Sequence, residues 1–230
     1  MIATITGHGH GSRLRTLSAG LPKIMVPVRG VPMVRRLVDE LVSAPIDLLV
    51  ITVPPGDAAV RRLVAGLPSP VEIEVRDALP GGVLHDVCRL LAEPGDHLLV
   101  DGDAVLPAGE LRRFAAAACD AGRPPYRSLL GVVARPARRD ERTIWARPSA
   151  GGTVQVTGRG RPGPLALAGC YALAPPLLDG LRAQLARGMR SFGDALVAVS
   201  PSVCAAPFLF TAACNVNTAE DLAVAQCIDP

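Results

Sequence analysis

The sequence predicts an α/β protein, a three-layer sandwich in which helices cover both faces of a mostly parallel central sheet. Two observations lead to this prediction. Short runs of β-branched and aliphatic residues alternate along the chain with segments whose apolar residues recur at helical spacing. Two of the strand-like runs also end directly in glycine-containing loops, which is where open sheets of this class bind their ligands.

The first half of the chain shows this alternation most clearly. Helical segments between successive strands favour parallel pairing, because a parallel crossover needs a dozen or more residues. We expect strands at residues 2–6, 46–53, 71–75, 97–100 and 128–134, and helices at residues 32–42, 57–65, 82–91 and 108–121.

The pattern changes in the second half, where residues 135–165 are rich in Pro, Gly and Arg. We interpret residues 135–170 as a small β-rich insertion within a single domain of residues 1–230. Thr218 is the expected N-cap of the last helix, with Asp221 in its first turn. The expected elements are strands at 143–146, 153–157, 203–206 and 207–210, and helices at 175–186 and 219–227.

Composition excludes several classes of protein. The net charge is only +3 and aromatic residues make up 3%, which argues against a nucleic-acid surface of basic and stacking side chains. No apolar run reaches about 18 residues, so we expect no transmembrane helix, and the start of the chain does not resemble a signal peptide. The six cysteines form no CxxC pair, and the four histidines do not join them at zinc spacing. We therefore expect a cytoplasmic protein with reduced thiols.

The opening stretch concentrates residue types that hold phosphate. Glycines let backbone N–H groups approach an anion closely, arginine binds phosphate through two donors, and lysine supplies a point charge. The stretch lacks both the Gly-Lys-Ser/Thr of a P-loop and the G-x-G-x-x-G of a dinucleotide fold, yet it predicts a phosphate cradle for a nucleotide. The residues concerned are Gly7, Gly9, Gly11, Ser12, Arg13 and Lys23, the last being the only lysine of the chain.

A second polar loop follows the expected strand at residues 97–100. Asp101 and Asp103 flank Gly102 there, directly after the apolar run. Because parallel strands end at the same edge of a sheet, this loop and the glycine-rich loop are expected to share one crevice.

Four motifs together resemble the nucleotidylyltransferases of GT-A-like α/β fold, which include sugar-1-phosphate nucleotidylyltransferases and molybdenum-cofactor guanylyl- and cytidylyltransferases. The first is G-x-G-S-R-L followed by P-K-x-x-x-P-V, within residues 9–28. The other three are LVDGD at 99–103, LAGCY at 167–171 and NVNTAEDL at 215–222. They occur in the family's order along nearly the whole chain.

The resemblance implies transfer of a nucleotidyl group from an NTP to a phosphorylated small molecule, with release of pyrophosphate and Mg²⁺ as the cofactor. Gly7, Gly9, Gly11 and Ser12 would wrap the nucleotide, and Asp101 would lie beside it. Arg13 and Lys23 would act on the phosphates, so they are the implied catalytic residues. Asp103 would bind Mg²⁺ together with Asn215 or Asn217. The loop at 79–82, with Gly81 and Gly82, takes the place of the family's base-contacting loop.

The acceptor side departs from the family. Gly7 and His8 stand where the family has alanines, Leu167 replaces an asparagine, and the Glu-Lys pair that contacts a sugar phosphate has no counterpart in residues 135–165. Arg159, Arg161 and Gly169 are the candidate acceptor-binding residues. A sugar or cyclitol phosphate is the expected acceptor. The alternatives are a molybdopterin-like phosphate and a non-catalytic nucleotide-binding homologue. A homodimer is left open, and no nucleic-acid or membrane partner is expected.

Overall fold

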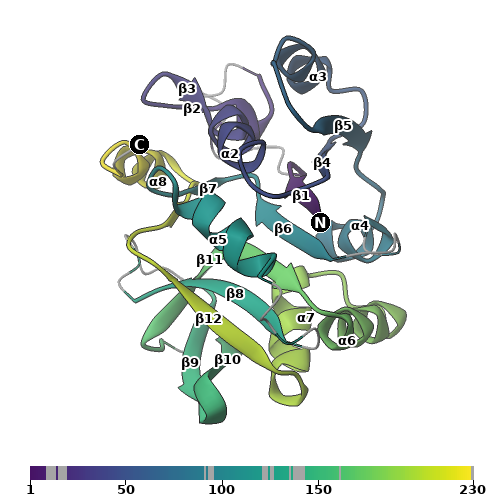
Figure 1. The fold of residues 1–230 in the computed structure, drawn as a ribbon, viewed down its shortest axis with the longest axis vertical. Helices are drawn as coiled ribbons and strands as arrows, with labels where there is room; N and C mark the ends of the chain where they lie inside the picture. Colours follow the sequence, from purple (N-terminus) through teal and green to yellow (C-terminus); the bar gives the residue numbers. More distant parts are fainter. Residues whose placement is uncertain are drawn as a thin grey trace.

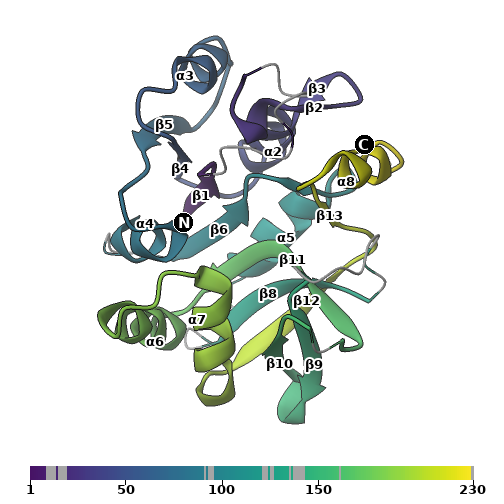
Figure 2. The same ribbon diagram turned by 180° about the vertical axis from the view of Figure 1, so that it is seen from behind.

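The computed structural model describes residues 1–8, 14, 20–90, 92, 96–120, 124, 127–134, 136, 143–160 and 162–228. A nine-stranded mixed sheet runs through the molecule, with helices on both faces (Figures 1 and 2). The predicted α/β sandwich is therefore confirmed. Among the described residues, every helix is too short or too polar to span a bilayer.

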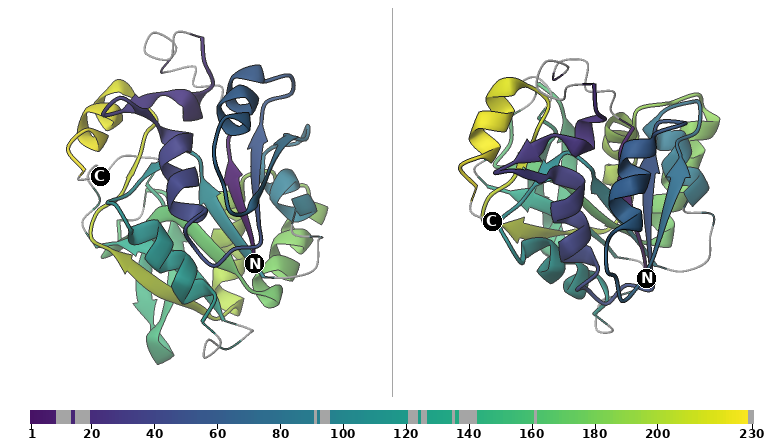
Figure 3. Two further views of the ribbon diagram at one scale, coloured as in Figure 1. Left: turned by 45° about the horizontal axis from the view of Figure 1, so that its top comes forward. Right: turned by 90° about the horizontal axis from the view of Figure 1, so that it is seen from above.

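The parallel half of the sheet is formed by the first four long strands, in the order β6-β1-β4-β5. Crossover helices connect them, as the helical spacing between the strands predicts. Figure 3 shows these strands side by side with their helices. The elements are β1 (Ile2–Thr6), α2 (Met33–Leu41), β4 (Leu48–Val53), α3 (Ala58–Ala65), β5 (Glu72–Asp77), α4 (Val83–Leu90) and β6 (His97–Asp101).

The other half of the sheet is built around β11 (Leu165–Leu173), which pairs antiparallel with β6, β8 and β9. The segment interpreted as a β-rich insertion thus supplies strands of the main sheet, and β11 lies beside β6. The helix α5 (Glu110–Ala118) precedes this half. The remaining strands are β8 (Ser128–Val133), β9 (Trp145–Ser149), β10 (Thr153–Gly158) and β12 (Ala205–Phe210).

Three of the longer elements differ from the sequence prediction. The strand β11 was not predicted, although the LAGCY motif at 167–171 lies within it. The strand is buried on both faces, so its sequence does not alternate between apolar and polar residues. The expected strands at 203–206 and 207–210 are one strand, β12. Its Pro207 is tolerated because, among the described strands, β12 pairs with β8 alone and so lies at an edge of the sheet. The helix α7 (Phe192–Val199), which follows α6 (Pro175–Ala186), was not predicted. Nearly all of its residues are apolar, so its sequence shows no helical spacing of apolar and polar positions.

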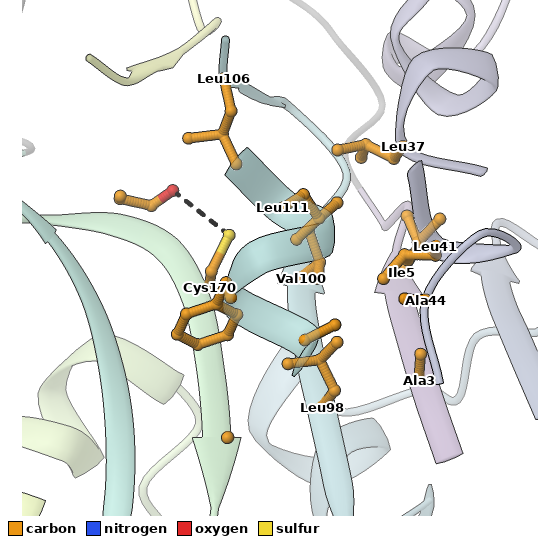
Figure 4. Packing of buried hydrophobic residues seen from close by; sticks show 14 of the residues in the cluster. Ala3, Ile5, Leu37, Leu41, Ala44, Leu98, Val100, Leu106, Leu111 and Cys170 are labelled. Carbon is orange, nitrogen blue, oxygen red and sulfur yellow. Dashed lines mark hydrogen bonds between the residues drawn. The ribbon is translucent and has the colours of Figure 1, made fainter. Parts of the chain in front are cut away.

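Two apolar clusters fill the two faces of the sheet. On one face, Ile5 of β1 and Val100 of β6 pack against Leu41 of α2 and Leu111 of α5, as Figure 4 shows. The opposite face packs against α4, α6 and α7, with Leu99 of β6 in its cluster. All six cysteines lie in the described part of the chain, and none of them forms a disulfide there. Burial on both faces fixes the strand ends from which the candidate site is built.

Candidate functional site

The candidate site begins where the neighbouring strands β1 and β6 end. Their parallel register pairs Thr6 with Asp101, so the two loops that follow leave the sheet side by side. The N–H of Gly7 donates to the Thr52 carbonyl at 2.8 Å, and the N–H of Gly102 donates to the Thr6 carbonyl at 2.9 Å. These hydrogen bonds hold the start of each loop against the end of the sheet.

Both positions need glycine because Ile24 packs against them. A Cβ on Gly7 would lie 2.5 Å from the Thr52 carbonyl oxygen and 2.7 Å from Ile24 Cδ1. A Cβ on Gly102 would lie 2.5 Å from the Thr6 carbonyl oxygen and 2.7 Å from Ile24 Cγ2. Close packing therefore gives a physical reason for Gly7, where the resembled family has alanine. Its contact with a nucleotide stays a prediction.

Lys23 is buried in the centre of the site, with only 8% of its surface exposed. It lies in the short 3₁₀ helix η2 (Lys23–Met25), after Pro22. Its ammonium forms an ion pair with the Asp103 carboxylate and donates to Asn217 Oδ1 at 2.8 Å. The only lysine of the chain thus joins two loops that lie 80 and 194 residues away in sequence.

A small two-stranded sheet brings those loops together. In it β7 (Ala104–Val105) pairs antiparallel with β13 (Cys214–Asn215), and the N–H of Val216 donates to the Asp103 carbonyl at 2.9 Å. The loop after β6 and the turn at residues 215–218 are therefore held in one position relative to each other.

The turn is fixed on its other side by the last helix, α8 (Ala219–Ala225), whose capping box is formed by Thr218 and Asp221 as the sequence predicts. Asp221 Oδ2 accepts from the N–H groups of Asn217 and Thr218, each at 2.9 Å. The side-chain amide of Asn217 donates to the Asn215 carbonyl at 3.2 Å, which leaves its oxygen facing Lys23. Asn217 thus binds the start of α8 through its backbone N–H and binds Lys23 through its side-chain oxygen.

Asp101 lies deeper in the site, beside β11. Tyr171 donates its hydroxyl to Asp101 Oδ2 at 3.4 Å, and a Cβ on Gly169 would lie 3.0 Å from that same oxygen. Burial, reinforced by the neighbouring charge of Asp103, raises the pKa of Asp101 to about 7, although Lys23 and the Tyr171 hydroxyl act in the opposite direction. Burial and Asp101 likewise raise the pKa of Tyr171. An aspartate that changes charge near neutral pH therefore lies next to the Lys23 ion pair.

These side chains line two adjoining hollows. The larger, of about 370 Å³, is lined by residues that include His8, Lys23, Asp103 and Arg159. The smaller, of about 130 Å³, is lined by apolar and polar side chains in similar number, Tyr171 among them. Four residues line both hollows, which makes them parts of one crevice: Asp101, Ile144, Asn215 and Asn217.

Neither a protein-family model nor a curated protein sequence matches this chain. Solved structures do. The inositol-1-phosphate CTP transferase from T. maritima aligns over 99% of this chain and 95% of its own, with a TM-score of 0.78 and 17% identity. A UDP-glucose pyrophosphorylase from Acinetobacter baumannii aligns over 98% and 92%, with a TM-score of 0.75 and 17% identity. A UDP-glucose pyrophosphorylase complexed with UDP-glucose aligns over 98% and 96%, with a TM-score of 0.74 and 14% identity.

The chain has the nucleotidyltransferase fold. Within this fold, the structure gathers many of the residues singled out from the sequence around the crevice. Arg159, from the loop after β10, lines the larger hollow and pairs with Asp194 of α7 at 3.3 Å. The other expected residues that line it are Lys23, Asp101, Asp103, Asn215 and Asn217. Gly169 lies against Asp101 and the side-chain amide of Asn215.

Other expected residues lie elsewhere in the nucleotidyltransferase fold or outside the described residues. Gly81 and Gly82, with φ values of 125° and 93°, form the turn before α4, and Gly81 lines a separate hollow of about 290 Å³. Gly9, Gly11, Ser12, Arg13 and Arg161 are the expected site residues that lie outside the described part of the chain.

The structure also adds residues that were not chosen as site residues from the sequence. His8 and Ile144 line the larger hollow, and Tyr171 contacts Asp101. Tyr171 could have been chosen, since it closes the LAGCY motif. Ile144 carries no chemical signal. His8 drew attention only as a departure from the family's alanine, and its contacts with Thr52 and Asp86 depend on tertiary packing.

Proposed function

We propose that this chain transfers a nucleotidyl group from an NTP to a phosphorylated small molecule and releases pyrophosphate, in a Mg²⁺-dependent reaction. The observation that carries the proposal is the buried Lys23 ammonium, held by Asp103 and Asn217 beside a crevice at the strand ends of a nucleotidyltransferase fold.

The reaction needs positioning and charge more than proton transfer. A phosphate oxygen of the acceptor forms a bond to the α-phosphorus, and the bond from that phosphorus to the pyrophosphate oxygen breaks. The attacking oxygen is already anionic, so no general base is required. The protein has to align the two phosphates and offset their combined negative charge.

Lys23 is suited to that work. Its ammonium has three donors, so one remains for a phosphate oxygen after Asp103 and Asn217 have each accepted one. Its burial strengthens the attraction to phosphate, because fewer water molecules screen the charge. Arg13 would add a second cation on the pyrophosphate side, according to the sequence resemblance.

The residues present fit Mg²⁺. The carboxylate of Asp103 and the amide oxygen of Asn217 already converge on a cation, the ammonium of Lys23. Among the described residues, no group of three or more His, Cys, Asp and Glu side chains could hold a metal. Mg²⁺ does not need such a group, because it uses one or two protein oxygens and takes water and phosphate oxygens for the rest. Bound there, the ion would neutralise charge that develops on the phosphates.

The acceptor is proposed to be a sugar or cyclitol phosphate. Its phosphate would lie in the larger hollow, between Arg159 and Lys23, and its ring would extend into the smaller hollow. There, Thr143, Tyr171 and Asn215 offer polar groups among apolar walls that include Leu167. Polar groups placed among apolar walls can fix the orientation of a small ligand.

The test is a pyrophosphate-release screen of the five common NTPs, including dTTP, against myo-inositol 1-phosphate and hexose 1-phosphates with Mg²⁺. One pair should support turnover, and K23M and D103N should each reduce it about 100-fold or more, the scale of losing a transition-state contact. D39N, which removes an exposed carboxylate on α2, is the matched control and should have no effect.

Thermal unfolding would confirm that each variant is folded. Undiminished turnover in K23M would refute the site. NTP binding without turnover for any pair would favour the non-catalytic alternative instead.

A further inference from the structure

The ammonium of Lys23 lies on the two oxygens that the proposed function gives to Mg²⁺. It pairs with Asp103 Oδ2 and donates to Asn217 Oδ1 at 2.8 Å. The side chains of Lys23 and Asp103 are only 11% and 18% exposed, so little water screens their charges. A divalent ion bound to these same two oxygens would have to displace the ammonium, because two cations in contact with one carboxylate oxygen repel each other strongly. Lys23 and such an ion therefore compete.

Both oxygens are held in place without Lys23. The N–H of Val216 donates to the Asp103 carbonyl, and β7, which begins directly after Asp103, pairs with β13. The backbone N–H of Asn217 donates to Asp221, and its side-chain amide donates to a neighbouring carbonyl. This last contact orients the amide oxygen toward the ammonium. The fold thus presents a preformed pair of cation-binding oxygens.

The ammonium, in contrast, lies at the end of a long side chain. Its backbone is fixed in η2, where the N–H of Val26 donates to the Lys23 carbonyl at 3.1 Å. The four-carbon stem has several rotamers and lines the larger hollow, so the ammonium can turn toward a ligand there without moving the backbone. Its departure would leave the Asp103 carboxylate without this cation, and breaking a buried ion pair in this way is strongly destabilising. The ammonium therefore leaves only when a second cation replaces it.

We propose that Lys23 blocks the Asp103 and Asn217 oxygens: its ammonium excludes a divalent ion until the phosphates of an NTP draw the ammonium away, so that nucleotide and metal bind together. The third donor of the ammonium contacts a phosphate oxygen first, and the other two are released as the ammonium moves. The proposal rests on the proposed function and adds an order of binding to it. By linkage, the nucleotide strengthens metal binding as much as the metal strengthens nucleotide binding.

The first measurement follows the ammonium itself. Lys23 is the only lysine of the chain, so a ¹³C label at lysine Cε gives one NMR signal from this residue alone. Millimolar Mg²⁺ without nucleotide should leave the signal unchanged. Mg²⁺ together with the α,β-methylene analogue of an NTP, which cannot release pyrophosphate, should shift it, and the analogues of the common NTPs are tried in turn. The D103N variant supplies the reference position of a Lys23 signal without its ion pair.

The second measurement is the binding of Mn²⁺ without nucleotide, followed by the loss of the free ion's EPR signal. K23M should bind Mn²⁺ about tenfold more tightly than the wild type or better, because the ammonium no longer competes. K23M/D103N should lose this gain, which locates the ion at Asp103. D39N, which removes an exposed carboxylate on α2, should bind as the wild type does. K23Q, which also lacks the charge, replaces K23M if that variant fails to fold.

A Lys23 signal that millimolar Mg²⁺ shifts without nucleotide would overturn the proposal, as would equal Mn²⁺ affinities of K23M and the wild type. An NTP analogue that binds without shifting the signal would also overturn it. The remaining outcome is that no analogue binds while K23M still binds Mn²⁺ more tightly. That result would refute the proposed function and leave the block by Lys23 at these oxygens in place.

Discussion

Gly169 provides a measurable test of how closely β11 approaches the site. The substitution G169A adds one methyl group where φ is +77°, a conformation that costs an L-residue about 1–2 kcal/mol. The added Cβ would lie 3.0 Å from Asp101 Cβ and Oδ2 and 3.1 Å from Asn215 Nδ2. Overpacking of this kind costs about 1–3 kcal/mol more. We therefore expect G169A to lose about 2–5 kcal/mol of unfolding free energy.

Gly188 is the matched control. It follows α6 with φ of +86°, and a Cβ there would have nothing within 4 Å. G188A should therefore lose only the backbone cost of about 1–2 kcal/mol. For a chain of this length about 3 °C of Tm corresponds to 1 kcal/mol, so Tm should fall by about 10 °C in G169A and about 5 °C in G188A.

The assay is thermal unfolding of both variants and the wild type in one buffer, followed by pyrophosphate release at 25 °C. Turnover should fall in G169A, because Asp101 and Asn215 have to move, and should persist in G188A. Equal losses of Tm and unaltered turnover in the two variants would refute the close approach of β11 to Asp101.

Two further predictions concern a charge and a helix start. The folded-state pKa of Asp101, about 7, lies above its ordinary 3.8, so its contribution to stability is fully present below pH 4 and is lost as pH rises through 7. D101N cannot ionise, so without divalent cations it should exceed the wild type in unfolding free energy by up to about 4 kcal/mol at pH 8 and by little at pH 4; a pH-independent difference in denaturant titrations would contradict this. T218A removes the N-cap of α8 and should lower the unfolding free energy by about 1 kcal/mol in the same titration at pH 7. An unchanged unfolding free energy would mean that the capping box does not stabilise the protein.

The parallel half of the fold was predictable because its signals are local. Each of β1, β4 and β6 is a short apolar run, and the helices between them show one apolar face. The start of α8 was predictable for the same reason, since Thr218 and Asp221 are three residues apart and cap each other. No distant contact has to be known for either prediction.

The antiparallel half depends on distant contacts. The strand β11 is buried between β6 and β8 and is interrupted by Gly169 at an irregularity in its pairing with β8, so neither alternation nor continuity marks it. The pairing of His8 with Asp86 is equally hidden. The sequence shows only an aspartate within the apolar pattern of α4 and a histidine after a strand, and the tertiary fold decides that they meet.

The candidate site falls between these cases. Motif resemblance singled out Lys23, Asp103 and Asn217, and the structure places all three in contact. The chemistry of that contact did not follow from the sequence: the ammonium lies between the two oxygens proposed for Mg²⁺. This arrangement depends on β7 and β13, two short strands whose pairing no local pattern indicates.

The most direct test of the proposed function follows the α-phosphate of the NTP. The protein is incubated with Mg²⁺, the acceptor found in the screen and NTP labelled with ³²P at either the α- or the γ-position, and the products are separated chromatographically. We predict that the α-label enters a product containing the acceptor and that the γ-label appears in pyrophosphate, both with the wild type and neither with K23M. Release of the α-label as free nucleoside monophosphate, or no transfer to any acceptor tested, would contradict the proposed reaction.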